Sequence, residues 1–416
     1  MGLAMAAVMS LAAEGGIGLA RRVSDIEVSL IVRISELAAA RKKAGEDIIS
    51  LGTGEPDFDT PDFVKAAAKT AMDRGETKYT ANTGTAELKQ AIVAEYARQG
   101  VTIAPANVIA SAGAKQVLFN AFMATLDPGD EVVIPAPYWT SYVDMVSICG
   151  GVPVTVPTRG EDGFVLAPEA LERAITPRTK WLLFNSPSNP TGGAYDAGQL
   201  RALLPVLARH PHVGLMSDEI YEHLVYDDFA FVSALKALPE MAERVLVVNG
   251  VSKSYAMTGW RLGYGVGPRA LIDAMAVVQG QATSAPSSIS QAAAAAALNG
   301  PRDVVAERRE DFWRRRDLVV AGLNAVEGLV CDSPRGAFYV FPDCTGLLGR
   351  RTPQGTIVET DADLCEYYLE QAGVAVVPGT AFGSPGHFRI SYAYAQVALE
   401  KALERIAAAS AALVKP

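Results

Sequence analysis

The sequence predicts an α/β fold, with a mainly parallel sheet in a large domain and a smaller α+β domain beside it. Helix-like and strand-like segments alternate through most of the chain, as they do where helices cover a parallel sheet. Short apolar runs bounded by turn residues are typical of the buried strands of such a sheet. With 416 residues, half of them apolar, the chain is long enough for two or three domains with sizeable cores.

The elements of the large domain follow in chain order. Residues 59–75 start with a threonine cap and an early proline and end at Gly75, a pattern that predicts a helix. Residues 113–130 predict a second helix, which opens at a glycine and stops at Pro128 and Gly129. Buried strands are expected at four apolar runs: 131–137, 180–185, 212–217 and 244–249.

The last hundred residues change character and predict the smaller domain. A long helix is expected over roughly 301–326, followed by a strand candidate at 336–343. A polar loop is expected near 345–360, and two more strand candidates follow at 374–383 and 387–393. The expected division of the chain is a flexible extension at 1–23, a small domain formed by 24–60 together with 300–416, and a large domain at 61–299.

The charge balance and the apolar pattern exclude two classes of partner. The formal net charge is −9, the sequence pI is about 5.2 and no basic tract is present, so no nucleic-acid partner is expected. The short run Arg314–Arg316 falls inside the predicted long helix, where a solvated face is expected. No apolar run reaches the ~18–20 residues that a membrane helix needs, so no membrane partner is expected.

Cysteine usage predicts a reducing compartment. The chain has four cysteines and four histidines, and no CxxC pair occurs, so neither a zinc site nor a disulfide framework is expected. The apolar N-terminus has no lysine or arginine before it, unlike a secretory signal peptide. These features predict a cytoplasmic protein without a bound metal.

Polar residues follow three of the predicted strands at the point where each strand ends. Asn189 follows the second strand, Asp218 and Tyr221 the third, and Lys253 the fourth. Ligands bind outside the carboxyl ends of the strands in open α/β sheets, so these side chains are expected to converge. Each also has a purely structural interpretation: a turn for Asn189, a helix cap for Asp218 and a solvated side chain for Lys253. The glycines of 263–267 lack nucleotide-motif spacing and indicate close strand packing.

Several motifs in a fixed order carry a family resemblance. SPSNPTG, SDEIYEH, SKSYAMTGWRLGY and FRISYA together resemble the class I pyridoxal-phosphate aminotransferases, from about residue 24 to the end of the chain. LGTGEPDFDTP, RGETKYTANTGTAELK and GAKQVLFNAFMATLDPGDEVVIPAPYWTSY are most similar to the bacterial, rhizobial-type aspartate aminotransferase branch. The resemblance implies fold type I of the pyridoxal-phosphate-dependent transferases, with pyridoxal 5′-phosphate as cofactor.

The resemblance assigns one group of residues to the two ends of the cofactor. Lys253 matches the Schiff-base lysine, which also moves a proton between the substrate and the cofactor. Ser252 and Arg261 are implied to hold the phosphate. The backbone of Gly113 and Ala114, at the start of a helix, is implied to complete the phosphate site.

A second group is implied around the cofactor ring. Asp218 matches the carboxylate that keeps the pyridine nitrogen protonated. Tyr221 and Asn189 are implied to hydrogen-bond the ring oxygen, and Trp139 to stack on the ring face. Tyr79 matches a tyrosine that reaches the phosphate from the neighbouring subunit, which implies a homodimer with shared active sites.

Substrate recognition is expected around Arg389, which matches the family arginine that binds the α-carboxylate. Gly54 allows close backbone approach to the same group, and Trp139 and Asn189 are expected to border it. Lys115 is the candidate for the distal carboxylate of an acidic substrate. Two other interpretations of Lys115 stay open, a further phosphate ligand and a surface lysine.

One departure from the family pattern concerns a Pro-Ser-Ala-Thr motif near the N-terminus. Ser29 remains, but Ile31 stands in place of the threonine that helps to read dicarboxylates. A polar contact to the distal group is therefore expected to be missing. This weakens the case for prephenate and leaves room for aromatic side chains.

The implied activity is ping-pong transamination of L-aspartate with 2-oxoglutarate, giving oxaloacetate and L-glutamate. An aromatic or broad-specificity aminotransferase is the first alternative, and a pyridoxal-phosphate-dependent β-lyase on the same fold is a remote one. A ligand-sensing regulator on this fold would carry an N-terminal winged-helix domain. Only about two dozen residues precede the matched region, so a regulator is not expected.

Overall fold

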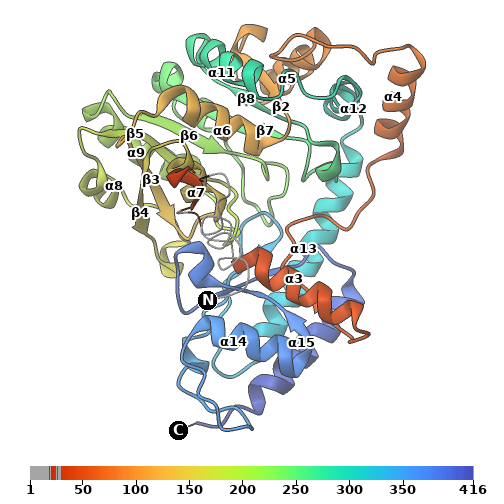
Figure 1. The fold of residues 1–416 in the computed structure, drawn as a ribbon, viewed down its shortest axis with the longest axis vertical. Coiled ribbons are helices and arrows are strands. Elements are labelled where there is room, and N and C mark those ends of the chain that lie inside the picture. Colours follow the sequence, from red (N-terminus) through yellow and green to blue (C-terminus); the bar gives the residue numbers. More distant parts are fainter. Residues whose placement is uncertain (1–17, 19, 25, 27–29, 416) are drawn as a thin grey trace.

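The computed structural model describes residues 18, 20–24, 26 and 30–415, which form a large α/β body and a smaller C-terminal one (Figure 1). The long helix α13 (Asp303–Asn324) runs from the large body into the smaller one in Figure 1. It confirms the helix predicted over 301–326. Ser29 and most of the expected extension at 1–23 lie outside the described residues.

A seven-stranded sheet forms the centre of the large body, in the order β2-β8-β7-β6-β5-β3-β4. Its strands are β2 (Val108–Ser111), β3 (Glu131–Ala136), β4 (Val152–Pro157), β5 (Thr179–Asn185), β6 (Gly214–Asp218), β7 (Val245–Gly250) and β8 (Gly263–Val266). All neighbours are parallel except β8, which is antiparallel to both β2 and β7. The four predicted strands are β3, β5, β6 and β7, so the mainly parallel sheet is confirmed.

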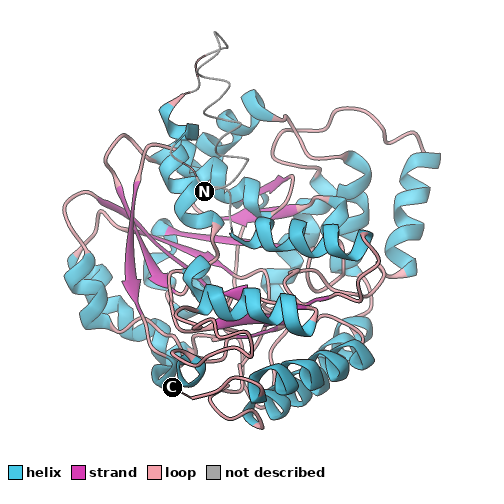
Figure 2. Ribbon diagram, turned by 60° about the horizontal axis from the view of Figure 1, so that its bottom comes forward, coloured by secondary structure: helices cyan, strands magenta, loops and turns pink. Residues whose placement is uncertain are grey.

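Helices cover both faces of this sheet (Figure 2). Those of the large body are α4 (Asp62–Asp73), α5 (Ala86–Arg98), α6 (Ala114–Thr125), α7 (Ser141–Ile148), α8 (Pro168–Ala174), α9 (Ala197–Arg209), α10 (Ala234–Ala237), α11 (Arg269–Ala282) and α12 (Ser288–Asn299). The one-turn helix α2 (Arg21–Ser24) and the longer helix α3 (Leu30–Lys43) precede them. No helix in the described part of the chain is both long enough and apolar enough to cross a bilayer.

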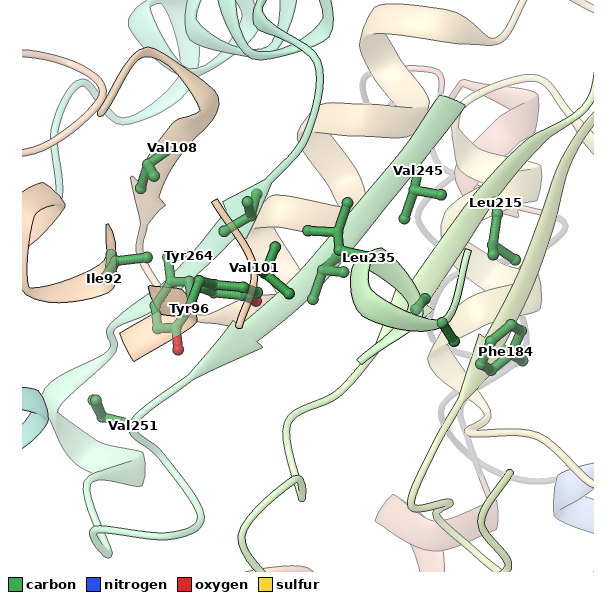
Figure 3. Close-up of a cluster of buried hydrophobic side chains, with 14 of the residues drawn as sticks. Ile92, Tyr96, Val101, Val108, Phe184, Leu215, Leu235, Val245, Val251 and Tyr264 are labelled. Carbon is green, nitrogen blue, oxygen red and sulfur yellow. The ribbon is translucent and has the colours of Figure 1, made fainter. Parts of the chain in front are cut away.

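Two apolar cores flank the sheet because side chains alternate between its faces along each strand. On one face, Leu215 and Val245 pack with residues of α5, α9 and α12 (Figure 3). On the other face, the next residues along the same strands, Met216 and Leu246, pack with residues of α6, α7 and α11. Both faces are therefore dry, which explains why the strands read as continuous apolar runs rather than alternating ones.

The smaller body joins the two ends of the chain. Strand β1 (Ile49–Ser50) pairs in parallel with β10 (Val374–Ala375), and β11 (Val377–Pro378), β12 (Phe388–Ser391) and β9 (Tyr339–Val340) form an antiparallel sheet in that order. Helices α14 (Asp361–Tyr367), the π-helix η6 (Tyr368–Ala372) and α15 (Gln396–Ala411) pack on α13 and these strands. Strands were predicted in all three segments that hold β9 to β12.

Two local expectations are wrong, each because of a contact with a distant segment. Thr60 does not cap α4: its Oγ1 donates to the Ala256 carbonyl at 2.7 Å, and the N-cap residue is Pro61. The hydroxyl binds the loop that carries Lys253 instead of the helix. Sequence spacing cannot reveal this competition, since the acceptor lies 196 residues away.

The Arg314–Arg316 run is also not a solvated face. Arg314 is exposed, but the side chain of Arg316 is only 4% exposed and its guanidinium pairs with Asp227. Arg315 pairs with Asp57 at 2.7 Å. The helix carrying this run lies between the two bodies, so two of its three arginines bind segments that pack on it.

Candidate active site

Lys253 lies in the turn after β7, partly buried, with its amine held by the protein backbone. Its Nζ donates to the Gly54 carbonyl at 2.5 Å and lies 5.9 Å and 5.8 Å from the ring centres of Tyr221 and Phe338. Burial, helped by the charge of Arg389 and opposed by those of Glu55 and Asp218, lowers the pKa of Lys253 to about 8. A lysine in this state has a neutral fraction near pH 7 and can act as a nucleophile or a base.

Asp218 ends β6 and is buried close to the lysine. Its Oδ2 accepts a hydrogen bond from the Tyr142 hydroxyl at 2.7 Å, and its Oδ1 accepts from the Ile220 N–H at 3.3 Å. Burial raises the pKa of Asp218 to about 6, against the effect of these bonds and of the Lys253 charge. The chain continues in a turn rather than a helix, so Asp218 is not the helix cap of the alternative interpretation.

Arg389, on β12, is fully buried and is the third charged group of the site. The space around Lys253, Asp218 and Arg389 is called the pocket below. Its guanidinium donates to Asn189 Oδ1 at 2.7 Å and to the Gly52 carbonyl, while its Nε has no hydrogen-bond partner. The rings of Tyr339 and Phe382 lie 4.8 Å and 4.9 Å from it. A buried guanidinium without a carboxylate partner is a binding site for an anion.

An anion cradle lies where α6 begins. The first N–H groups of a helix have no intrahelical acceptor and attract anions. Gly113 precedes α6 with a φ of 94°, and a Cβ at this position would lie 2.6 Å from the Arg261 guanidinium. A Cβ at Gly263 would lie 2.2 Å from the Ala114 nitrogen. The glycines thus bring Arg261, the helix N-terminus and β8 together, which confirms the close packing expected at 263–267. Ser252 is buried next to Lys253.

Lys115 and Trp139 form the side of the pocket next to the cradle. The Nζ of Lys115 lies 4.6 Å from the centre of the Trp139 ring. Trp139 meets Tyr142 edge to face, with 5.4 Å between ring centres. Burial lowers the pKa of Lys115, and the charge of Arg261 adds to the effect. Aromatic contacts therefore connect Lys115 to the Tyr142–Asp218 pair.

The fold brings most of the predicted residues together but leaves one apart. Lys253, Asp218 and Arg389 act on one another electrostatically, and Asn189 and Tyr221 contact them directly. These residues come from the ends of β5, β6 and β7 and from β12 of the smaller body. Tyr79, in contrast, is 95% exposed on the loop before α5.

Two tyrosines of the pocket were not predicted. Tyr142 lies three residues after Trp139, and this spacing on a helix could have indicated a shared face. Tyr339 carries no signal in the sequence, because it sits in an apolar strand segment among core residues. Its hydroxyl lies 2.8 Å from that of Tyr221. Tyr142 reaches the site within the large body, whereas Tyr339 reaches it only because the two bodies meet.

Outside the pocket, Glu95, Glu222 and His223 bring ligand-type atoms within 4.8 Å of one another. Glu95 is already paired with two arginines, Arg98 and Arg302. Because two cations occupy one of the carboxylates, the cluster forms a buried ion-pair network that disfavours a further cation.

The fold and the pocket define an α/β enzyme that binds a phosphorylated cofactor with an aromatic nitrogen ring. The cradle at α6 fits a phosphate, Asp218 fits a protonated ring nitrogen, and Lys253 fits an aldehyde. The family model for class I and II aminotransferases matches residues 46–406. The chain belongs to this family, so it is an aminotransferase and uses pyridoxal 5′-phosphate.

Relatives of known name support the assignment. The chain is 59% identical to the aspartate aminotransferase of Rhizobium meliloti (strain 1021), covering 95% of this chain and 97% of the relative. It is 53% identical to the aspartate/prephenate aminotransferase of Cereibacter sphaeroides, covering 94% and 98%. The crystal structure of the Rhizobium meliloti aspartate aminotransferase superimposes with a TM-score of 0.94, at 59% identity, covering 96% of this chain and 100% of that one. The fold type I prediction is confirmed.

Proposed function

We propose that the protein transaminates L-aspartate with 2-oxoglutarate, giving oxaloacetate and L-glutamate in two half-reactions. The observation that carries the proposal is the buried Arg389, with its Nε unpartnered, in the same pocket as Lys253 and Asp218. An arginine so placed suits the α-carboxylate of an amino acid next to the reacting amine. Relatives named aspartate aminotransferase support the choice of substrate.

In this proposal, different residues bind the aldehyde end and the phosphate end of the cofactor. Pyridoxal phosphate supplies an electron sink that makes the Cα–H bond of the substrate acidic. Lys253 holds the aldehyde carbon. Arg261, Ser252 and the first N–H groups of α6, at Gly113 and Ala114, hold the phosphate.

The ring is oriented by residues at the strand ends. Asp218 keeps the ring nitrogen protonated, because a positive charge against a buried carboxylate lowers the pKa of the carboxylate and raises that of the nitrogen. Tyr221 and Asn189 face the ring oxygen, and Trp139 covers the ring. These groups would orient the bound cofactor and hold its ring nitrogen in the protonated form.

Lys253 would be the group that moves the proton when a substrate occupies the site. Its pKa of about 8 leaves the amine partly neutral, so that it can accept the Cα proton and return it. The Gly54 carbonyl holds the amine in position, while Arg389 fixes the substrate by its α-carboxylate. Lys115 binds the distal carboxylate of aspartate from the Trp139 side of the pocket.

The proposed assembly is a cytoplasmic homodimer with shared active sites. Tyr79 is exposed in one chain and reaches the phosphate of the other. The division into a small domain, 24–60 with 300–416, and a large domain, 61–299, belongs to the same proposal, because it places Arg389 and Lys253 on different domains. All four cysteines are free thiols, which suits a reducing compartment.

The proposal is tested by a single half-reaction. The purified yellow protein is mixed with L-aspartate alone, and the absorbance of the cofactor is followed. Conversion to the pyridoxamine spectrum with release of oxaloacetate is expected, and 2-oxoglutarate then restores the original spectrum. A spectrum unchanged by aspartate overturns the substrate assignment, and release of pyruvate and ammonia from a sulfur amino acid indicates the β-lyase.

An aromatic amino acid is the second candidate substrate, and one observation favours it. Ile31, on α3, packs against Phe341, Val377 and Phe382, and the ring of Phe382 lies against Arg389. The wall next to the α-carboxylate site is therefore apolar at the position where the family carries a threonine. L-Tyrosine in the same half-reaction measures how far this wall accepts an aromatic side chain.

Replacing Ile31 by threonine is expected to raise the preference for acidic over aromatic donors. A hydroxyl that hydrogen-bonds a carboxylate contributes roughly 1–2 kcal/mol, so the ratio of kcat/KM for aspartate to that for tyrosine rises about 5- to 30-fold. Ile31→Val is the matched control, since valine has the shape of threonine without the hydroxyl. Equal ratios in the two variants contradict a role for the missing hydroxyl.

A further inference from the structure

Tyr339 lies where the two bodies of the protein meet, and its hydroxyl contacts Tyr221, which is proposed to face the cofactor ring. It sits on β9 of the smaller body and is completely buried. Its hydroxyl is 2.8 Å from that of Tyr221, which follows β6 of the large sheet. The two rings cross edge to face, with 5.8 Å between their centres. This hydrogen bond joins residues 118 positions apart in the chain.

The ring of Tyr339 also carries the substrate-binding arginine. The Arg389 guanidinium lies 4.8 Å from the ring centre, with Phe382 4.9 Å away. An aromatic face attracts a guanidinium and fixes its plane. One side chain therefore touches both the group that holds the α-carboxylate and the hydroxyl that faces the cofactor ring.

A third contact concerns the backbone that holds the lysine. A Cβ at position 54 would lie 2.5 Å from the Tyr339 hydroxyl, so only glycine allows the hydroxyl its present place. The carbonyl of this same Gly54 accepts the hydrogen bond of Lys253. The Tyr339 hydroxyl thus lies against the segment that positions the catalytic amine.

We propose that Tyr339 is a positioning residue that donates its hydroxyl proton to Tyr221 and thereby strengthens the hydrogen bond from Tyr221 to the cofactor ring oxygen. The inference rests on the proposed function, which puts that oxygen beside Tyr221. Hydrogen bonds in a chain polarise one another in a buried site. Burial raises the pKa of both phenols, and the Arg389 charge opposes this at both. In the proposed function the Tyr221 hydroxyl donates its own proton to the ring oxygen, so it accepts the hydrogen bond from Tyr339.

The test is a pH titration of the cofactor absorbance in loaded Tyr339→Phe, with Tyr368→Phe as matched control. Tyr368 is equally buried in the smaller body and shares a 2.8 Å hydroxyl–hydroxyl bond with Ser410, which is not among the residues proposed to hold the cofactor. Without the Tyr339 hydroxyl, the hydrogen bond from Tyr221 to the ring oxygen is expected to weaken, which leaves that oxygen more basic. The ring oxygen would share a proton with the nitrogen that joins Lys253 to the cofactor, so this nitrogen is expected to lose its proton at a higher pH. In Tyr339→Phe, the pH at the midpoint of the absorbance titration is expected to rise by about 0.2 to 0.6 pH unit. In Tyr368→Phe, this midpoint is expected to stay at the wild-type value.

A double variant shows whether Tyr339 acts through the Tyr221 hydroxyl or only through the packing of its ring. In a Tyr221→Phe background, Tyr339→Phe is expected to cause no further shift, because the hydroxyl it feeds is gone. The KM for aspartate is expected to stay within twofold of wild type, since phenylalanine keeps the ring under Arg389. An unshifted midpoint in Tyr339→Phe, or the same shift with and without the Tyr221 hydroxyl, overturns the proposal. A wild-type protein with no cofactor absorbance overturns the proposed function instead, and this inference with it.

Discussion

Replacing Lys253 by alanine abolishes turnover, with kcat expected to fall by at least roughly 10⁴-fold. The variant loses the general acid–base step, which alone contributes about 10²–10⁴-fold, and it also loses the covalent attachment of the cofactor. Both losses follow from the site, because the Gly54 carbonyl holds the Lys253 amine where the charges of Asp218 and Arg389 act on it. Steady-state turnover of aspartate measures the first loss. Borohydride reduction followed by mass measurement of the intact chain detects the second.

The control for this variant is Lys401→Ala. Lys401 pairs with Asp47 on the surface of the smaller body and has no contact with the pocket. Wild-type kcat and a reducible cofactor adduct are expected in this variant. Full activity in Lys253→Ala, or a cofactor adduct that survives reduction in it, removes the central assignment of the site.

Replacing Asp218 by asparagine has the second largest expected effect, a fall in kcat of roughly 10²–10³-fold. Asparagine preserves the volume of the side chain and the bond to Tyr142, but it has no charge to keep the ring nitrogen protonated. The fold is expected to survive, because a neutral amide costs less to bury than a carboxylate whose pKa burial already raises to about 6. Turnover of aspartate and the thermal midpoint are measured together.

The neighbouring Glu219 provides a matched control. It is equally buried, its Oε1 accepts from the Ser217 hydroxyl and the Ala234 N–H, and burial raises its pKa to about 8. The acid is thus largely neutral at pH 7, and Glu219→Gln replaces it with a neutral amide. We expect kcat within about threefold of wild type. Near-wild-type kcat in Asp218→Asn, or an equal loss in Glu219→Gln, shows that the ring-nitrogen contact is wrongly placed.

The sequence predicted the large body well because its signals are local. Apolar runs of four to seven residues ending in a polar cluster mark β5, β6 and β7, and the residues at their carboxyl ends converge as expected. The helix that opens at Gly113 begins where the sequence places it and ends at Thr125, shortly before the predicted stop at Pro128. A parallel sheet with both faces covered imposes this pattern on each strand separately, so each strand can be recognised without knowledge of its neighbours.

The sequence did not predict the contacts between segments that are distant in the chain. Thr60 binds the Lys253 loop rather than its own helix, Arg316 binds Asp227 rather than water, and Tyr142 turns out to be the side-chain donor to Asp218. The sequence favours a local use for Thr60, Arg316 and Asp218: a helix cap, a solvated face and a helix cap. The tertiary contact prevailed because the local alternative left a buried polar or charged atom without a partner.

The sequence by itself therefore determined the fold class, the family and the residues that we propose to face the cofactor. Only the tertiary structure decided how the two chemical halves of the site connect. Arg389 and Tyr339 lie on strands of the smaller body, while Lys253, Asp218 and Tyr221 lie at the strand ends of the large sheet. A motif records which residue types a segment carries, but the approach of two bodies is set by packing over the whole chain, so no local pattern encodes the hydroxyl of Tyr339 against that of Tyr221.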